Sequence, residues 1–346
     1  MDLKSGYPYW AIRNGLMHAF PPLQQDRHCD VLVVGGGISG ALIANELCAH
    51  GHDVVLIEQR DIGWGSTAAS TALLQYEIDT HLVDLARQYG EPAGVLAYRA
   101  CAEAIPALRA VAAGFRGVDC QPMRSLYYAS RQRHASVLRE EYALRQRHGF
   151  DVTWLERGDL QARYGISAPG AILSALAARV DPYQLTYRLL MRLARAGCAV
   201  HDRTTLHTLQ TTARGVNAIT AEGLQIRARH VVLATGYAGQ RWLTPRVARN
   251  RSSYAFITDP VDPDLLGALS NTMVWESARP YLYLRSTGDH RLLVGGEDDA
   301  VDVPARRDAR VQSKAATLLK QVNRLFPELP LQPAFSWGGT FAETPD

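Results

Sequence analysis

The sequence has almost no net charge, and it lacks any long apolar run. Basic residues number 37 against 34 acidic ones, which leaves a formal net charge of +3, and only three of the basic residues are lysine. A balance this close to zero argues against nucleic acid or an anionic membrane as a partner. No stretch approaches the roughly 18 uninterrupted apolar residues of a transmembrane segment. Charged side chains also interrupt residues 1–22, so the start of the chain does not resemble a signal peptide.

Cysteine is scarce and scattered. The five cysteines are an odd number with no C-x-x-C pair, so neither a disulfide scaffold nor a cysteine-based zinc site is expected. Cys48 falls in an Ala- and Leu-rich helical pattern and is predicted to be a small core residue. The 11 histidines contain no H-E-x-x-H spacing, and no metal site is predicted. A reducing, cytoplasmic location is the expectation from this pattern.

The remaining composition is that of a globular chain. Apolar residues make up 47% and charged residues 21% of the 346 positions, both ordinary fractions for a folded protein. The length fits about two domains. Residues 80–150 show helical patterns, and the charged segment 131–148 is predicted to be a solvated helix face rather than a nucleic-acid-binding helix.

Near the N-terminus, two apolar runs flank a glycine-rich turn. Residues 30–34 suit a buried parallel strand, a helical stripe begins at residue 38, and residues 54–57 suit a second strand. Residues 35–40 satisfy G-x-G-x-x-G, in which the glycines allow a tight turn, close approach of a pyrophosphate and close helix–strand packing. The acid that ends the second strand lies 18 residues after the last glycine, as a ribose-binding carboxylate would. The predicted cofactor contacts here are Gly35, Gly37, Ile38, Ser39, Gly40, Glu58 and Gln59.

FAD and NAD share this fingerprint, so other segments must separate them. Residues 231–236 read as another buried strand that runs into Ala234, Thr235 and Gly236. In many flavoproteins with two dinucleotide folds, an Ala-Thr-Gly strand end returns to the flavin nucleotide. These three residues are therefore predicted to contact the cofactor, although a plain strand-end turn would look the same.

Several motifs, taken together, are typical of one family. They occupy residues 33–40, 58, 63–71, 180–182, 233–236, 292–296 and 337–340. With them the chain resembles the D-amino-acid-oxidase-like flavoproteins, which include glycine oxidase and sarcosine oxidase. The resemblance implies an α/β fold in which a Rossmann-like FAD-binding domain is interleaved with an α+β substrate domain. The expected boundaries are 1–27 for an N-terminal extension, 28–80 and 170–245 for the FAD-binding domain, and 81–169 and 246–346 for the substrate domain.

The resemblance also implies a reaction and further cofactor contacts. The reaction is oxidation of a C–N bond in a small amine or amino acid, by transfer of a hydride equivalent to flavin N5. Four hydroxyl residues are expected along the pyrophosphate and the flavin, unless they merely form a loop that caps a helix; they are Ser66, Thr67, Ser70 and Thr71. The backbone of Leu206 is expected to contact the adenine. Because no histidine lies in residues 65–71 and no cysteine follows Cys198, the FAD is expected to be non-covalent.

Departures from the family pattern leave the substrate and the electron acceptor open. Phe341 stands where glycine-oxidase-like members carry an arginine for the substrate carboxylate, and Arg285 is the candidate replacement, unless it is a surface residue. Leu293 stands where sarcosine-oxidase-like members carry a lysine linked to oxygen reactivity, so the acceptor is either oxygen or a quinone or carrier. Tyr76 and Glu77 are candidates to orient an amine and to bind its charge, against the alternative of an ordinary strand.

The family resemblance further predicts a C-terminal truncation, because relatives continue beyond Asp346 with a helix whose N-terminus points at the flavin. Two alternatives therefore stay open beside the amine or amino-acid oxidoreductase. One is a truncated flavin-binding protein without turnover. The other is an NAD-linked dehydrogenase, against which the Ser/Thr segment and the Ala-Thr-Gly triplet both argue.

Overall fold

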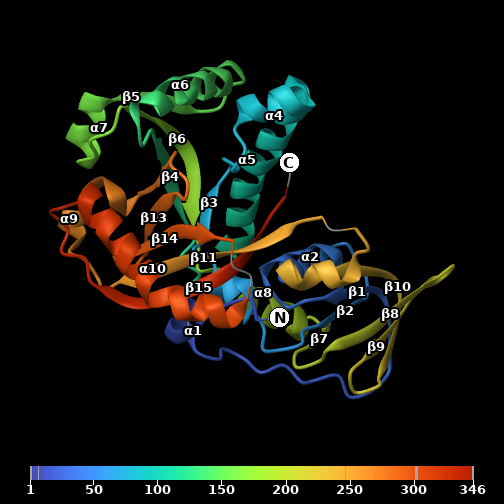
Figure 1. The fold of residues 1–346 in the computed structure, drawn as a ribbon. Helices are drawn as coiled ribbons and strands as arrows, with labels where there is room; N and C mark the ends of the chain where they lie inside the picture. Colours follow the sequence, from blue (N-terminus) through green and yellow to red (C-terminus); the bar gives the residue numbers. More distant parts are fainter. Residues whose placement is uncertain (1, 7, 246, 301–302, 345–346) are drawn as a thin grey trace. The chain divides into compact units, whose positions relative to one another are not determined.

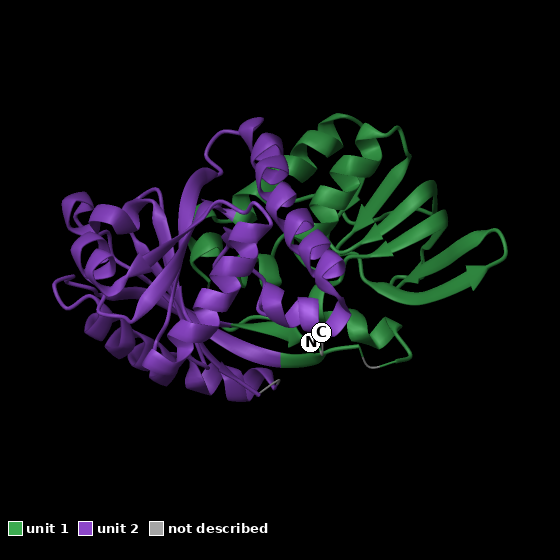
Figure 2. Ribbon diagram, turned by 90° about the horizontal axis from the view of Figure 1, so that it is seen from above, with its two compact units in different colours: residues 1–70, 182–250, 339–344 green, residues 71–181, 251–338, 345–346 purple. Residues whose placement is uncertain are grey.

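The computed structural model describes residues 2–6, 8–245, 247–300 and 303–344 (Figure 1). Contacts between Cα atoms divide the chain into two compact units, each built from separated segments (Figure 2). Unit 1 comprises residues 1–70, 182–250 and 339–344, and unit 2 comprises residues 71–181, 251–338 and 345–346. The chain therefore passes between the units several times, and each unit has a sheet of its own.

Unit 1 contains a sheet with the strand order β7-β2-β1-β10-β9-β8. Its strands are β1 (Arg27–Val34), β2 (Val54–Ile57), β7 (Ala199–His201), β8 (Leu206–Thr212), β9 (Gly215–Thr220) and β10 (Gln225–Leu233). The first four strands of that order pair in parallel, and β9 and β8 continue the sheet antiparallel. The apolar runs of β1 and β2 are buried as the sequence predicts, because a parallel strand is covered on both faces.

The helices of unit 1 are α1 (Tyr9–Asn14), α2 (Ile38–Ala49), α3 (Ser66–Ala69), α8 (Pro182–Arg195) and the 3₁₀ helix η1 (Gly236–Trp242). Helix α2 directly follows β1 and so completes the predicted βαβ unit with β2. Leu32, Val34, Val55, Ile57 and Leu206 belong to one apolar cluster that joins the strands. This packing holds the end of β1, and with it the glycine turn, on a rigid sheet.

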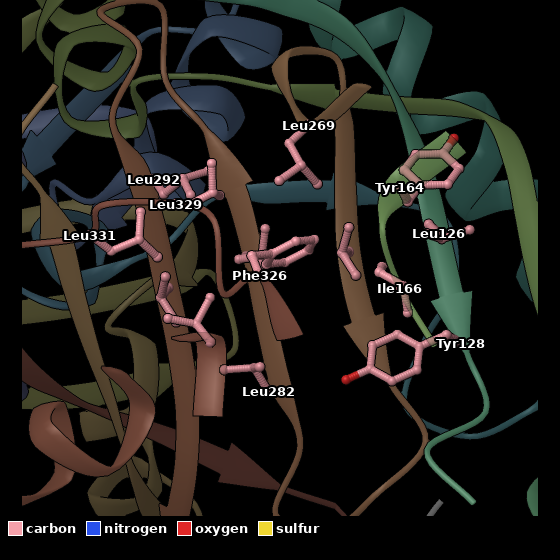
Figure 3. Packing of buried hydrophobic residues seen from close by; sticks show 14 of the residues in the cluster. Leu126, Tyr128, Tyr164, Ile166, Leu269, Leu282, Leu292, Phe326, Leu329 and Leu331 are labelled. Atoms are coloured by element: carbon pink, nitrogen blue, oxygen red, sulfur yellow. The ribbon is translucent and has the colours of Figure 1, made fainter. Parts of the chain in front are cut away.

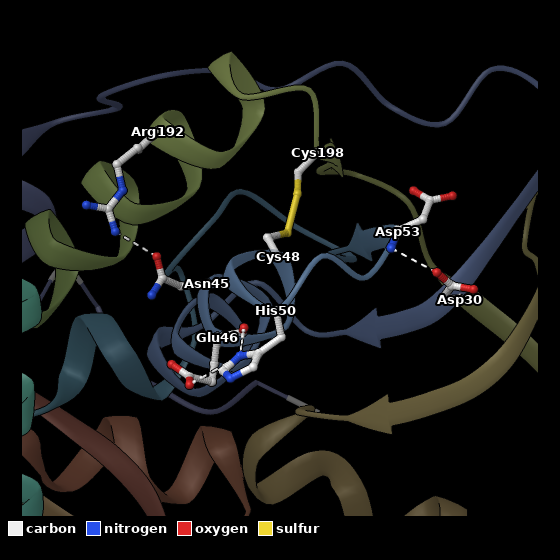
Figure 4. The surroundings of a disulfide bond; sticks show 8 residues. All are labelled: Asp30, Asn45, Glu46, Cys48, His50, Asp53, Arg192 and Cys198. Atoms are coloured by element: carbon white, nitrogen blue, oxygen red, sulfur yellow. Dashed lines mark hydrogen bonds and ion pairs between the residues drawn. A yellow bond between two sulfur atoms is a disulfide. The ribbon is translucent and has the colours of Figure 1, made fainter.

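A disulfide between Cys48 and Cys198 links the last turn of α2 to the connection between α8 and β7 (Figure 4). This corrects the expectation that Cys48 is an unpaired core residue. The two cysteines are 150 residues apart in the sequence, and only the packing of α2 beside α8 brings them together. No local spacing signals such a pair.

Unit 2 is built on a larger sheet with the order β15-β11-β14-β13-β12-β4-β6-β3, to which β5 adds by pairing with β6. The strands are β3 (Leu73–Gln75), β4 (Gln121–Tyr128), β5 (Val152–Glu156), β6 (Gly170–Arg179), β11 (Arg249–Thr258), β12 (Thr272–Glu276), β13 (Leu282–Ser286), β14 (Leu292–Asp299) and β15 (Pro333–Glu343). The helices are α4 (Leu82–Tyr89), α5 (Glu91–Ala113), α6 (Gln132–Arg147), α7 (Arg157–Tyr164), α9 (Pro263–Leu266), η2 (Gly267–Ser270) and α10 (Pro304–Leu325). Strands β13 and β14 form an antiparallel pair.

The main apolar core of unit 2 lies on one face of this sheet (Figure 3). It includes Leu282 and Leu284 of β13 and Val294 of β14, and α10 contributes Leu318 and Val322. Because side chains alternate along a strand, the odd-numbered neighbours on β13 point to the opposite face. Helix α10 therefore covers one face of β13 and β14 and leaves their other face to different partners.

Helix α6 departs from the solvated face predicted for residues 131–148. Arg139 and Glu140 are exposed, but Glu141 and Arg145 are completely buried. Because these two residues are four positions apart, their side chains lie on the same face of the helix. This face packs against the rest of unit 2. Among the described residues, no helix is long and apolar enough to cross a membrane.

Candidate cofactor and active site

The glycine turn at the end of β1 requires glycine for steric reasons. Gly35 has a φ of 116°, and a Cβ there would lie 2.3 Å from the carbonyl oxygen of Ala234. A Cβ at Gly40 would lie 1.9 Å from the carbonyl oxygen of Gly35. Both distances are far below van der Waals contact, so the turn packs backbone on backbone as a phosphate-binding turn does.

Helix α2 begins directly after this turn. Gly37 is its N-cap, and the N–H of Ile38 donates to the hydroxyl of Thr67 at 2.9 Å. The next N–H groups, of exposed Ser39 and of Gly40, have no acceptor within the helix because they belong to its first turn. With the positive end of the helix dipole, they favour an anion such as a pyrophosphate.

The carboxylate of Glu58 lies beside the turn. It accepts the N–H of Gly36 at 2.7 Å on Oε2 and the N–H of Arg60 at 3.0 Å on Oε1. Burial raises the pKa of Glu58, and the two backbone hydrogen bonds oppose that rise. Gln59, the other predicted contact at this strand end, is exposed. Glu58 is thus positioned at the end of β2, where the fingerprint places its ribose-binding acid.

Two hydroxyl groups near the turn are buried without a hydrogen-bond partner in the described part of the chain: Ser66 Oγ and Thr235 Oγ1. Thr235 follows Ala234, whose N–H donates to the carbonyl oxygen of Val34 at 2.8 Å. Ser66 begins α3, next to the Thr67 that bonds the start of α2. A buried hydroxyl without a partner is costly, and a bound phosphate or heterocycle would supply both partners. These residues therefore fit a dinucleotide.

The other predicted cofactor contacts have defined positions. The carbonyl oxygen of Ser70 accepts the indole N–H of Trp10 at 2.7 Å. The carbonyl oxygen of Leu206 accepts an N–H of Arg241 at 3.0 Å, while the Leu206 side chain lies in the core. Thr71 is the first residue of unit 2. Their contacts to a cofactor stay predictions.

Tyr76 and Glu77, the predicted catalytic candidates, lie in a buried polar cluster of unit 2. Only 1% of Tyr76 and 4% of Glu77 is exposed. Ser174 donates a short hydrogen bond to Glu77 Oε1, and an Nη of Arg145 lies 3.4 Å from the same oxygen. Burial raises the pKa of Tyr76 to about 12 and also raises the pKa of Glu77. The cluster surrounds both side chains with protein, and a role toward substrate stays a prediction.

Glu141 and Arg145 complete this cluster, although no catalytic motif in the sequence contains them. Arg145 Nε donates to Glu141 Oε1 at 2.7 Å, and the N–H groups of Leu82 and Val83 each donate to the same carboxylate at 3.0 Å. Glu141 therefore caps α4 from α6. Burial acts to raise its pKa, but Arg145 and the two N–H groups lower it overall. The four-residue spacing of a glutamate and an arginine on one helix was the available signal.

Arg285 is fully buried on β13 and donates three hydrogen bonds to backbone carbonyl oxygens. The acceptors are Thr71 at 2.7 Å, Ser286 at 3.1 Å and Val180 at 3.1 Å. Burial lowers the pKa of Arg285 to about 10. The arrangement is typical of an arginine that ties strands and loops together, and the idea that it clamps a substrate carboxylate stays a prediction. Leu293 is also fully buried.

No group of three or more potential metal ligands is found among the residues that the structure describes.

Comparison with known proteins identifies similar sequences. The profile of a family described as FAD dependent oxidoreductase (DAO) matches residues 30–346. Glycine oxidase of Geobacillus kaustophilus (strain HTA426) is 26% identical over 329 residues, covering 92% of this chain and 82% of that protein. Gamma-glutamylputrescine oxidoreductase of Escherichia coli (strain K12) is 25% identical over 350 residues, covering 97% and 79%. A relative in Bacillus subtilis (strain 168) is 25% identical over 231 residues, and the chain spans only 44% of its length.

Solved structures share the fold. The crystal structure of glycine oxidase from Geobacillus kaustophilus superimposes with a TM-score of 0.74 at 22% identity, covering 92% of this chain and 84% of that one. L-proline dehydrogenase from P. horikoshii gives a TM-score of 0.75 at 17% identity, covering 94% and 83%. At these identities the structures establish the architecture alone.

Proposed function

The chain belongs to the family of FAD dependent oxidoreductases, and from that premise we propose that it oxidises a C–N bond of a small amine or amino acid. The family's cofactor is FAD, which would accept a hydride equivalent from the carbon that bears the nitrogen. The observation that carries the proposal is the pair of partnerless buried hydroxyls, Ser66 and Thr235, beside a turn that only glycine can form. Glycine oxidase and gamma-glutamylputrescine oxidoreductase, both named for nitrogen-bearing substrates, support the substrate class.

Unit 1 is the proposed FAD-binding part. Its glycine turn and the first turn of α2 would hold the pyrophosphate, Glu58 would bind ribose hydroxyls, and Thr235 would hydrogen-bond the nucleotide. The FAD is non-covalent in this proposal. Unit 2 would then supply the substrate side, with Tyr76 and Glu77 as candidates there. The proposal keeps the cytoplasmic location, although the Cys48–Cys198 disulfide removes the cysteine pattern from its support.

The electron acceptor in this proposal is oxygen or a quinone or carrier. Leu293 has a buried apolar side chain in β14, and it brings no positive charge that would favour reduction of oxygen at that position. A carrier is therefore the acceptor that we would test first.

The deciding experiment is a visible absorption spectrum of the purified chain, followed by heat release and identification of the cofactor. Releasable FAD, together with turnover of at least one compound in a panel of amines and amino acids with an artificial acceptor, supports the proposal. FAD without any turnover would instead favour a flavin-binding protein without catalysis. Released NAD in place of FAD would contradict the cofactor assignment.

A further inference from the structure

One face of the unit 2 sheet carries polar side chains at β11, β13 and β14. Leu282 and Leu284 of β13 enter the core beside α10, so alternation directs Tyr281 and Tyr283 to the opposite face. Ser253 of β11 lies on that face as well, since the next residue, Tyr254, enters the core on the α10 side. This face is the one that α10 leaves uncovered.

Ser253, Tyr283 and Asp298 lie close together on this face and are called the amine patch below. The Ser253 side chain lies near both the Tyr283 hydroxyl and the Asp298 carboxylate, and its Oγ donates to the carbonyl oxygen of Gly296 at 3.5 Å. Thr71, which is predicted to lie along the flavin, is also near the Tyr283 hydroxyl. Asp298 Oδ1 is buried and has no hydrogen-bond partner within the described residues. This oxygen therefore lacks a donor, and a buried acceptor without a donor is costly.

The Tyr283 ring is seated on Gly295 of β14. A Cβ at Gly295 would lie 2.4 Å from both Cζ and the hydroxyl oxygen of Tyr283. The strand therefore leaves room for the ring because it has no side chain there. This close approach holds the hydroxyl in place next to Ser253 and Thr71.

The basic residues near Asp298 have other acidic partners. Arg279 lies 3.9 Å from Asp79 and stacks over the Tyr281 ring at 4.4 Å. Lys314 of α10 donates to Glu297 at 3.0 Å. Burial raises the pKa of Asp298, Asp79 adds to the rise, and Ser253, Arg279 and Lys314 only oppose it. The carboxylate is thus desolvated without a cation of its own, which is the setting that favours an incoming cation.

We propose that the amine patch binds the positively charged nitrogen of the substrate, with an N–H of that nitrogen donating to Asp298 Oδ1. The hydroxyls of Ser253 and Tyr283 lie alongside this oxygen. Substrates are then recognised by their positive charge. Arg285, the predicted clamp for a substrate carboxylate, instead donates to backbone carbonyls. The inference rests on the proposed function and names its substrate class as cationic amines.

The test is calorimetric binding of two ligands of the same shape and opposite charge, benzamidine and benzoate, to the FAD-loaded chain. Wild type is expected to bind benzamidine more tightly than benzoate. Asp298→Asn should weaken benzamidine binding about tenfold or more, since a hydrogen bond to a charged group is lost. Glu297→Gln is the matched control, because it removes the adjacent charge from a carboxylate already engaged by Lys314 and Gln321.

Either of two results would overturn the inference. The first is that wild type binds benzoate more tightly than benzamidine, or does not bind benzamidine at all. This comparison needs no variant. The other is unchanged benzamidine binding in a folded Asp298→Asn variant. If the chain oxidises amines and the Asp298→Asn variant binds benzamidine as tightly as wild type, only this inference is removed and the proposed function stands. Benzamidine binding through Asp298 without turnover of any amine removes the proposed function and leaves the cation subsite.

Discussion

The N–H of Ala234 donates a 2.8 Å hydrogen bond to the carbonyl oxygen of Val34, and this bond joins two motifs that lie 200 residues apart. Val34 is the last residue before the glycine turn, and Ala234 begins the Ala-Thr-Gly triplet. The parallel pairing of β1 with β10 produces the contact, because parallel strands end at the same edge of a sheet. Thr235 is thereby held beside Gly35.

The partnerless hydroxyl of Thr235 leads to a prediction about FAD affinity. Thr235→Val keeps the shape and removes the hydroxyl, so FAD binding should weaken about tenfold through loss of one hydrogen bond. The apoprotein should keep or slightly gain thermal stability, because that hydroxyl has no partner in the described chain. Fluorescence titration of the apoprotein with FAD and thermal melting measure the two effects. Thr211→Val, at an exposed position of β8, is the control, and equal FAD affinity in both variants would contradict the assignment.

The Cys48–Cys198 disulfide predicts a thiol count. Titration of the denatured chain with a thiol reagent should give three thiols, from Cys29, Cys101 and Cys120, before reduction. After reduction it should give five. Five thiols in both samples, from protein purified without reductant, would mean that the bond does not form. The Cys48→Ser variant is a further check, since it should show four thiols without reduction.

Because His81 is largely buried, we expect the free energy of unfolding to fall in mild acid. Burial lowers its pKa below the ordinary value of 6.5, and Nε2 is 3.0 Å from the Tyr127 hydroxyl. Because the folded state disfavours the proton, the unfolded state binds more protons below about pH 6.5, and stability falls as pH decreases. His81→Gln should remove this part of the pH dependence. Urea unfolding at pH 7.5 and pH 5.5 measures it; a stability difference between wild type and variant that does not change with pH would contradict the prediction.

The three hydrogen bonds of Arg285 lead us to expect that its replacement lowers the stability of the fold. Arg285→Lys keeps a positive charge but cannot reach three carbonyl oxygens at once, so the free energy of unfolding should fall by about 3 kcal/mol or more. Binding of benzoate to the folded variant should be unchanged. Urea unfolding and calorimetry provide the two readouts. A variant of full stability that loses benzoate binding would instead restore the carboxylate clamp. Arg324→Lys, at an exposed position of α10, controls for a general effect of the exchange.

Local sequence patterns predicted the family and the fold class, and they favoured FAD over NAD as the cofactor. The glycine turn, the acid at Glu58 and the flanking apolar runs encode their geometry over about 30 consecutive residues, so spacing alone predicts the βαβ unit. The Ala-Thr-Gly triplet added the expectation of a second strand at the same edge, and the pairing of β10 with β1 agrees with it. Such features are predictable because the residues that make them are neighbours in the chain.

Which distant side chains meet depends on tertiary packing. Cys48 reaches Cys198 through the packing of α2 and α8, and Arg285 is surrounded by carbonyls from three separate segments. Arg145 is paired with Glu141 of its own helix, but its second carboxylate, Glu77, reaches it from the segment after β3. The same holds for Asp298, whose neighbour Ser253 is on another strand. Burial and charge pairing depend on contacts between distant segments, and no local pattern of residues encodes those contacts.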